Sequence, residues 1–193
     1  IGMPATVALM LLSGPLLAAL FQYGQFDAHD VAMSARSLMA FAFGLVAFML
    51  IKVLAPGFYA RKDTRSPVKY GVIAMVANTA LVLSLVWPLA HAGLALATSL
   101  AAFLNAGLLF FNLRRRGIYR PRAGWTKFLI QLAAANLAMG LVLWFGVGDL
   151  ESWVHASARA RLSHLAWLIA AGGGSYLLAV LLVGIRPRHL LLR

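Results

Sequence analysis

The chain contains no cysteine and very few acidic residues, and both shortages narrow what it can do. Without cysteine it can form no disulfide, thiolate metal site or cysteine nucleophile. Only 5 of its 193 residues are Asp or Glu, and none is placed to complete a Ser–His–Asp catalytic arrangement. Asp27, His29 and Asp30 are too few and too exposed for a metal site. No glycine-rich phosphate loop is present either, so we expect no enzymatic activity.

Charged residues of both signs are also scarce, because apolar residues take their place. The chain is 62% hydrophobic and 11% charged, with a mean hydropathy of +0.85. A soluble domain is about 45–50% apolar and about 25% charged. A globule of this size could not hide such an excess from water. The composition therefore predicts a membrane protein.

The apolar residues gather in runs of the length that crosses a bilayer as an α-helix, about 20 residues. They do not alternate as the strands of a membrane β-barrel would, and a backbone in lipid must pair internally. We therefore expect an all-α integral membrane protein, a single membrane domain over residues 1–193. Its expected spans, six in number, cover about 3–21, 31–54, 70–89, 93–113, 128–147 and 162–185.

In a soluble protein, the net charge of +12 would suggest a nucleic-acid partner. The positions of the Lys and Arg residues argue against that interpretation. Lys and Arg concentrate in 55–69, 114–127 and 186–193, whereas 22–30 and 87–92 contain neither. The positive-inside rule then places the basic connections and both ends of the chain in the cytoplasm. Arg159 and Arg161 depart from this pattern, within a segment at 148–161 that we interpret as a short interfacial piece.

Small and polar residues inside the spans suggest how the helices associate. Gly93, Ala97, Ala101 and Asn105 recur every four residues, which predicts a ridge for close helix packing. Asn78 could bond to another helix or contribute an oxygen to a cation or substrate site. Arg36, one to two turns inside its span, could either snorkel or face a functional cavity, whereas Lys52 is expected to anchor a helix end.

Two segments of the sequence resemble a known family. Residues 21–26 read Phe-Gln-Tyr-Gly-Gln-Phe, and residues 52–69 form a helix end followed by a basic loop. Both are similar to segments of the MurJ (MviN) family, and the resemblance weakens over the last two spans. The motif residues of the cytoplasmic loop are Lys52, Pro56, Gly57, Phe58, Tyr59, Arg61 and Lys62.

This resemblance implies a lipid II flippase, which carries the lipid-linked peptidoglycan precursor across the bacterial inner membrane by alternating access. The family belongs to the multidrug/oligosaccharidyl-lipid/polysaccharide exporter superfamily and has fourteen helices in a MATE-like fold. The chain is similar to helices nine to fourteen, its C-terminal part. Residues 1–113 would then be four helices of the second lobe, 114–127 a basic cytoplasmic loop, and 128–193 two groove-forming helices with a basic tail.

The same resemblance implies partners and site residues. The expected partners are lipid II, membrane lipids and the N-terminal part of the same transporter, since Ile1 opens inside an apolar stretch. The substrate-pathway candidates are Arg36, Asn78, Thr98 and Asn105. Asn78 and Thr98 also match part of a family sodium site, but Val82 stands where that site has an acid. We expect no organic cofactor and no firmly assigned metal, with a monovalent cation or the membrane potential as candidate driving forces.

Two other functions remain open at this stage. A related ion-coupled exporter of another lipid-linked glycan or of a drug would share the apolar spans. A membrane scaffold that assembles with partners but transports nothing would share them too.

Overall fold

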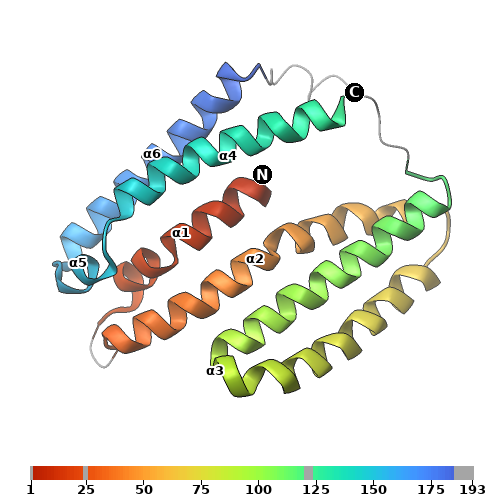
Figure 1. Ribbon diagram of the computed structural model, residues 1–193, viewed down its shortest axis with the longest axis horizontal. Helices are drawn as coiled ribbons and strands as arrows, with labels where there is room; N and C mark the ends of the chain where they lie inside the picture. Colours follow the sequence, from red (N-terminus) through yellow and green to blue (C-terminus); the bar gives the residue numbers. More distant parts are fainter. Residues whose placement is uncertain (1, 24–25, 120–123, 185–193) are drawn as a thin grey trace. The chain divides into compact units, whose positions relative to one another are not determined.

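The computed structural model describes residues 2–23, 26–119 and 124–184, and all regular elements in these ranges are α-helices (Figure 1). Residues 24 and 25 of the segment at 21–26, residues 120–123 of the predicted basic loop and the basic tail 186–193 lie outside the described residues. The helices are α1 (Gly2–Phe21), α2 (Ala28–Tyr59), α3 (Arg65–Arg115), α4 (Trp125–Val147), α5 (Leu150–His155) and α6 (Ala158–Leu182).

Within the described ranges, 5 helices are long and apolar enough to cross a membrane: all except α5. The 51-residue α3 is more than twice the length that one crossing needs. It is interrupted at Ala90, whose φ of 46° and ψ of −125° are not helical. Helix α3 therefore supplies two of the predicted spans, and the all-helical membrane fold is confirmed. The segment predicted to be interfacial contains the short helix α5.

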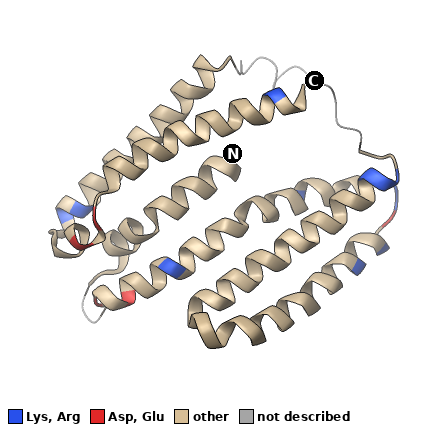
Figure 2. Ribbon diagram, in the orientation of Figure 1, with Lys and Arg blue, Asp and Glu red and all other residues tan. Residues whose placement is uncertain are grey.

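The charged residues of the described chain gather near the helix ends. Figure 2 shows that the helices carry almost no charge along most of their length. This distribution is the one expected when lipid surrounds the middle of each helix, because a charge there is costly.

The chain divides into two compact units. Unit 1 contains the described residues of 3–32 and those from 124 onward, and unit 2 contains residues 33–119. Thus α1 and the start of α2 group with α4, α5 and α6, whereas the rest of α2 groups with α3. This grouping does not test the predicted division into 1–113, 114–127 and 128–193.

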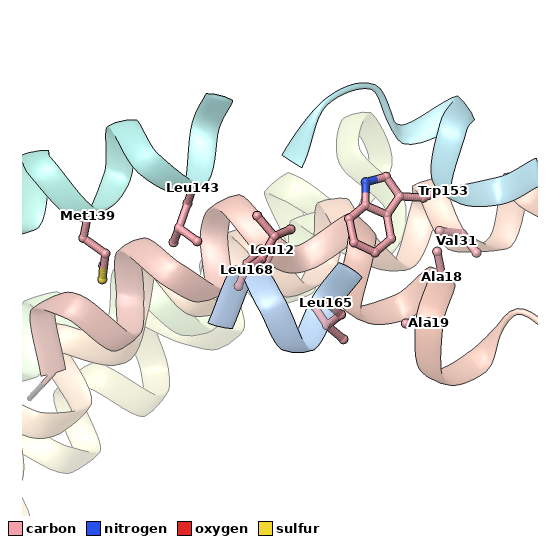
Figure 3. Close-up of a cluster of buried hydrophobic side chains, with 9 residues drawn as sticks. All are labelled: Leu12, Ala18, Ala19, Val31, Met139, Leu143, Trp153, Leu165 and Leu168. Atoms are coloured by element: carbon pink, nitrogen blue, oxygen red, sulfur yellow. The ribbon is translucent and has the colours of Figure 1, made fainter. Parts of the chain in front are cut away.

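Unit 1 is held together by side chains from all of its helices (Figure 3). Helices α4 and α6 approach closely at glycines: a Cβ atom on Gly172 would lie 2.8 Å from Cδ2 of Leu143, and one on Gly146 would lie 2.6 Å from Cδ2 of Leu168. Small residues promote such packing where lipid gives no hydrophobic drive between helices. The buried cluster comprises Leu12, Ala18, Ala19, Val31, Met139, Leu143, Trp153, Leu165 and Leu168.

Unit 2 is packed through the predicted small-residue ridge and its neighbours. Gly93, Ala97 and Ala101 are buried, and a Cβ atom on Gly93 would collide with the carbonyl oxygen of Leu85. The two halves of α3 therefore meet backbone to backbone near Ala90. The prediction of a packing ridge is confirmed for these residues.

Candidate functional site

The predicted substrate-pathway residues all lie in unit 2. Arg36 is exposed on α2, whereas Asn78, Thr98 and Asn105 are half-buried on α3. The Thr98 hydroxyl donates a hydrogen bond to the Leu94 carbonyl oxygen at 2.9 Å. Among the described residues no hydrogen bond or ion pair joins any two of the four candidates, so their shared role in a pathway stays a prediction.

Asn105 is one of several residues with a buried side-chain atom that has no hydrogen-bond partner among the described residues. Its Oδ1 atom is buried and accepts no hydrogen bond from the described residues. Leaving a buried polar atom unpaired costs about 1–3 kcal/mol. A donor from a substrate, a water molecule or another polypeptide segment would remove that cost, which keeps Asn105 among the candidates.

A metal site finds little support in the described part of the chain. It contains no group of three or more His, Cys, Asp or Glu residues that could hold an ion. Thr98 and Asn78 can offer oxygen atoms to a monovalent cation, but Val82 has none to add. The partial sodium pattern therefore stays a prediction.

The family-motif loop between α2 and α3 is organised around Asp63. Its Oδ2 accepts hydrogen bonds from Arg116 Nη1 at 2.5 Å and Ser66 Oγ at 2.7 Å, and its Oδ1 accepts from the Ser66 backbone N–H at 3.0 Å. The bonds from Ser66, with a further contribution from Arg116, lower the pKa of Asp63 from 3.8 to about 2. Because Arg116 follows directly after α3, this cluster ties the loop to the far end of that helix.

The aromatic residue of the motif belongs to the same junction. Phe58 is fully buried, its ring meets Tyr70 edge-on, and the Arg116 guanidinium carbon lies 5.7 Å above its centroid. The Asn112 amide donates to the Tyr70 hydroxyl, and a Cβ atom on Gly57 would lie 3.2 Å from Leu113 Cδ2. Gly57 and Phe58 therefore act in packing.

The other motif residues point outward instead. They present a largely cationic surface at this end of unit 2, and a ligand or lipid headgroup could reach them. The exposed motif residues are Lys52, Pro56, Tyr59, Arg61 and Lys62.

Arg161 is a buried residue whose importance the sequence did not reveal. Arg159 and Arg161 looked alike as departures from the charge pattern, yet Arg159 is exposed and Arg161 is only 8% exposed. Arg161 Nη1 donates to the Ala18 carbonyl at 3.0 Å, and Nη2 donates to the Val154 carbonyl at 2.5 Å. The departure from the charge pattern, which Arg159 shares, is the sequence signal that points to this segment, and it does not distinguish the buried arginine from the exposed one.

Apolar hollows are found between helices in the described part of unit 1. One of about 320 Å³ lies among α1, α4 and α6, with Leu12, Met139 and Tyr176 in its lining. The other, of about 490 Å³, is a shallow open groove between α1 and α4, lined in part by Asn136 and Trp144. Their chemistry suits hydrocarbon chains. They adjoin the two helices that the family resemblance predicts to form a groove.

Comparisons with known proteins agree with this picture. A family model described as "Lipid II flippase MurJ" matches residues 1–162. A probable lipid II flippase MurJ of Vibrio cholerae is 42% identical over 191 residues, which cover 98% of this chain and 36% of that protein. A probable lipid II flippase MurJ of Haemophilus influenzae is 39% identical over 191 residues, covering 99% of this chain and 37% of that protein.

A solved structure, "Lipid II flippase MurJ, inward closed conformation", matches in fold. The TM-score is 0.76 at 22% sequence identity, over 98% of this chain and 36% of that one. At this identity the match supports the fold alone. The chain spans about a third of the length of the curated relatives it matches.

Proposed function

The chain belongs to the lipid II flippase MurJ family, and from that premise we propose that it forms part of a transporter that flips lipid II. The observation that carries the proposal is the 42% identity to a probable flippase along 98% of the chain. The transporter would lie in the bacterial inner membrane and work by alternating access. Its basic connections would face the cytoplasm.

Each unit offers a surface whose chemistry would suit a different part of lipid II. The apolar cavities of unit 1 would suit the hydrocarbon tail of the lipid. Its pyrophosphate headgroup needs positive charge, and Arg36 is a cation within the span of α2. Arg36 is exposed and has no hydrogen bond or ion pair with the described residues. A cation inside a membrane span is costly unless it faces water or an anion, so we assign Arg36 to the headgroup path.

The energy source and partners form the less direct part of the proposal. The relatives are nearly three times as long as the matched region, so the remainder of such a transporter would cover the open faces of both units. Oxygen atoms from Asn78 and Thr98 are candidates to bind a monovalent cation. The membrane potential is the alternative driving force, and the absence of a carboxylate at Val82 favours it.

An exchange protein tests the proposed function. In it, this chain replaces the matching 36% of the Vibrio cholerae relative, and growth is measured in cells depleted of their own lipid II flippase. We expect the exchange protein to restore growth. If it reaches the membrane in normal amounts without restoring growth, the proposed function is wrong.

Arg36→Ala in the exchange protein tests the assigned residue. We expect growth to be lost, because Lys52, the remaining Lys or Arg of α2, lies sixteen residues away near the other end of the helix and would not meet the headgroup at the position of Arg36. Arg159→Ala is the matched control, since it removes the same charge from an exposed position elsewhere. Full growth with Arg36→Ala would remove Arg36 from the headgroup path.

A related ion-coupled exporter is the second candidate, because Asn78 and Thr98 match part of a sodium pattern. Flipping of lipid II by reconstituted exchange protein would be compared with and without a sodium gradient. Rates that depend on sodium, together with transport of another substrate in preference to lipid II, would favour the exporter. A protein that moves neither substrate would be a scaffold.

A further inference from the structure

Arg161 joins the end of one helix to a distant part of the chain. In addition to the Ala18 and Val154 carbonyls, its Nη1 approaches the Gln22 carbonyl at 3.4 Å. The Gln22 side chain in turn donates to the Val154 carbonyl at 3.3 Å. The end of α1, the end of α5 and the start of α6 therefore meet at one guanidinium group.

The electrostatics of this junction explain how it tolerates a buried charge. The last carbonyl groups of a helix have no partner within it, and they carry the negative end of the helix dipole. Arg161 supplies donors to these groups at the end of α1, more than 130 residues away in sequence. No carboxylate among the described residues pairs with it. The planar fork of arginine can reach two carbonyl directions at once, as a lysine ammonium cannot.

Helix α5 is itself held firmly against its surroundings. Trp153 is 2% exposed, and its indole N–H donates to the Val147 carbonyl at 2.7 Å. Its ring stacks on His164 of α6 with centroids 4.7 Å apart and planes 7° apart. The carbonyl of Val154, which accepts hydrogen bonds from both Arg161 and Gln22, therefore belongs to a helix that is held in place by these contacts.

We propose that Arg161 is a positioning residue that locks the Phe21 end of α1 to α5 and α6. With this lock closed, α1 moves together with α4, α5 and α6 as one body whenever the transporter changes conformation. Helices α4 and α6 then do not move independently of α1, because all three belong to the same rigid body. Of the two measurements described below, only the transport assay depends on the proposed function; the cross-linking measurement does not.

A designed disulfide tests the lock in a chain that has no other cysteine. A Cβ atom on Gly14 of α1 would lie 2.7 Å from Leu150 Cδ1 and 3.7 Å from Leu150 Cγ at the start of α5. A cysteine at position 150 would place its Sγ atom about where Leu150 Cγ now lies, 3.7 Å from the Cβ atom of a cysteine at position 14, so we expect a small shift to bring the two sulfur atoms together. In the exchange protein, with the relative's own cysteines removed, Gly14→Cys with Leu150→Cys is oxidised in membranes. Loss of labelling by a maleimide–polyethylene glycol reagent reports the cross-link.

The Arg161 variants give the first readout. In the two-cysteine protein, Arg161→Met is expected to slow cross-linking about tenfold, which corresponds to about 1.4 kcal/mol. The cross-linking rate of Arg161→Lys should lie between those of Arg161→Met and the parent. The rate of Arg159→Met, which changes an exposed residue, should equal that of the parent. An unchanged rate in Arg161→Met would overturn the lock. If Arg161→Met does not accumulate in the membrane, Arg161→Lys decides the question in the same way.

Transport provides the second readout. Reconstituted two-cysteine protein is assayed for lipid II flipping after oxidation and again after reduction. We expect equal rates, because a cross-link inside one rigid body restricts no motion. Activity that is lost on oxidation and regained on reduction would show that α1 must separate from α5, which would refute the proposal. If the reduced protein flips no lipid II, the proposed function fails, while the cross-linking rates still decide the lock.

Discussion

The contact between α2 and α3 at Gly44 can be tested by adding a single methyl group. A Cβ atom on Gly44 would collide with Ser99 Oγ and lie 2.8 Å from both Cα and Cβ of Ser99. Because one of these atoms is backbone, rotating the serine side chain cannot relieve the clash. The Ser99 hydroxyl also donates to the Ala40 carbonyl at 2.7 Å. Gly44→Ala must therefore push the two helices apart.

The magnitude follows from opposing effects. Overpacking a close contact costs about 1–3 kcal/mol, and loss of an interhelical hydrogen bond within a membrane costs about 0.6 kcal/mol. Alanine regains about 1 kcal/mol over glycine in a helix interior. We therefore expect Gly44→Ala to lower the free energy of unfolding by about 1–2 kcal/mol.

Gly107 of α3 supplies the matched control, because a Cβ atom there would meet no atom within 4 Å. Gly107→Ala should raise the free energy of unfolding by up to about 1 kcal/mol. Unfolding in mixed micelles with rising SDS, followed by tryptophan fluorescence, measures both variants. Should Gly44→Ala prove as stable as Gly107→Ala, the close contact inferred at Gly44 would be wrong.

Three further predictions concern single positions. Ala90→Gly should raise the free energy of unfolding by about 1 kcal/mol, and with it the melting temperature, because a φ of 46° strains any residue with a Cβ atom. Ala92→Gly, inside the helix, should lower it by a similar amount. The Asp63 carboxylate has a lowered folded-state pKa, so its stabilisation is present above its ordinary value of 3.8 and is lost as the pH falls through about 2. Between pH 5 and pH 2, the melting temperature should therefore depend less on pH in Asp63→Asn than in the parent protein. An unchanged dependence would contradict the hydrogen-bonded cluster around Asp63. Trp153→Phe should cost about 1–3 kcal/mol by leaving the Val147 carbonyl unpaired, whereas a fully stable variant would show that this bond is unimportant.

Much of the fold could be predicted because the membrane spans depend on the hydropathy of residues that are neighbours in the sequence. The hydropathy of about 20 neighbouring residues is enough to identify a membrane span, so the spans were recovered without knowledge of their neighbours. The four-residue recurrence of Gly93, Ala97 and Ala101 likewise predicted a packing face, which is buried.

The candidate site could be predicted only in part. Lys52 near the end of α2 and Arg61 and Lys62 after it are exposed, as a basic surface requires, but Phe58 of the same motif is buried under Arg116. A motif records which residues recur together and does not say which of them touch each other. Arg36, Asn78, Thr98 and Asn105 stay predictions, because no hydrogen bond or ion pair among the described residues joins any two of them, and the chain spans only about a third of the length of its relatives.

The sequence by itself determined the helical membrane class, the number of spans and the family, since composition, run length and motif are all local properties. Only the tertiary structure decided that Arg161 is buried while Arg159 is exposed, and that α1 groups with α4, α5 and α6. The physical reason is the same in both cases. The guanidinium is stabilised by carbonyls of Ala18 and Val154, which come near it only when helices far apart in sequence pack together.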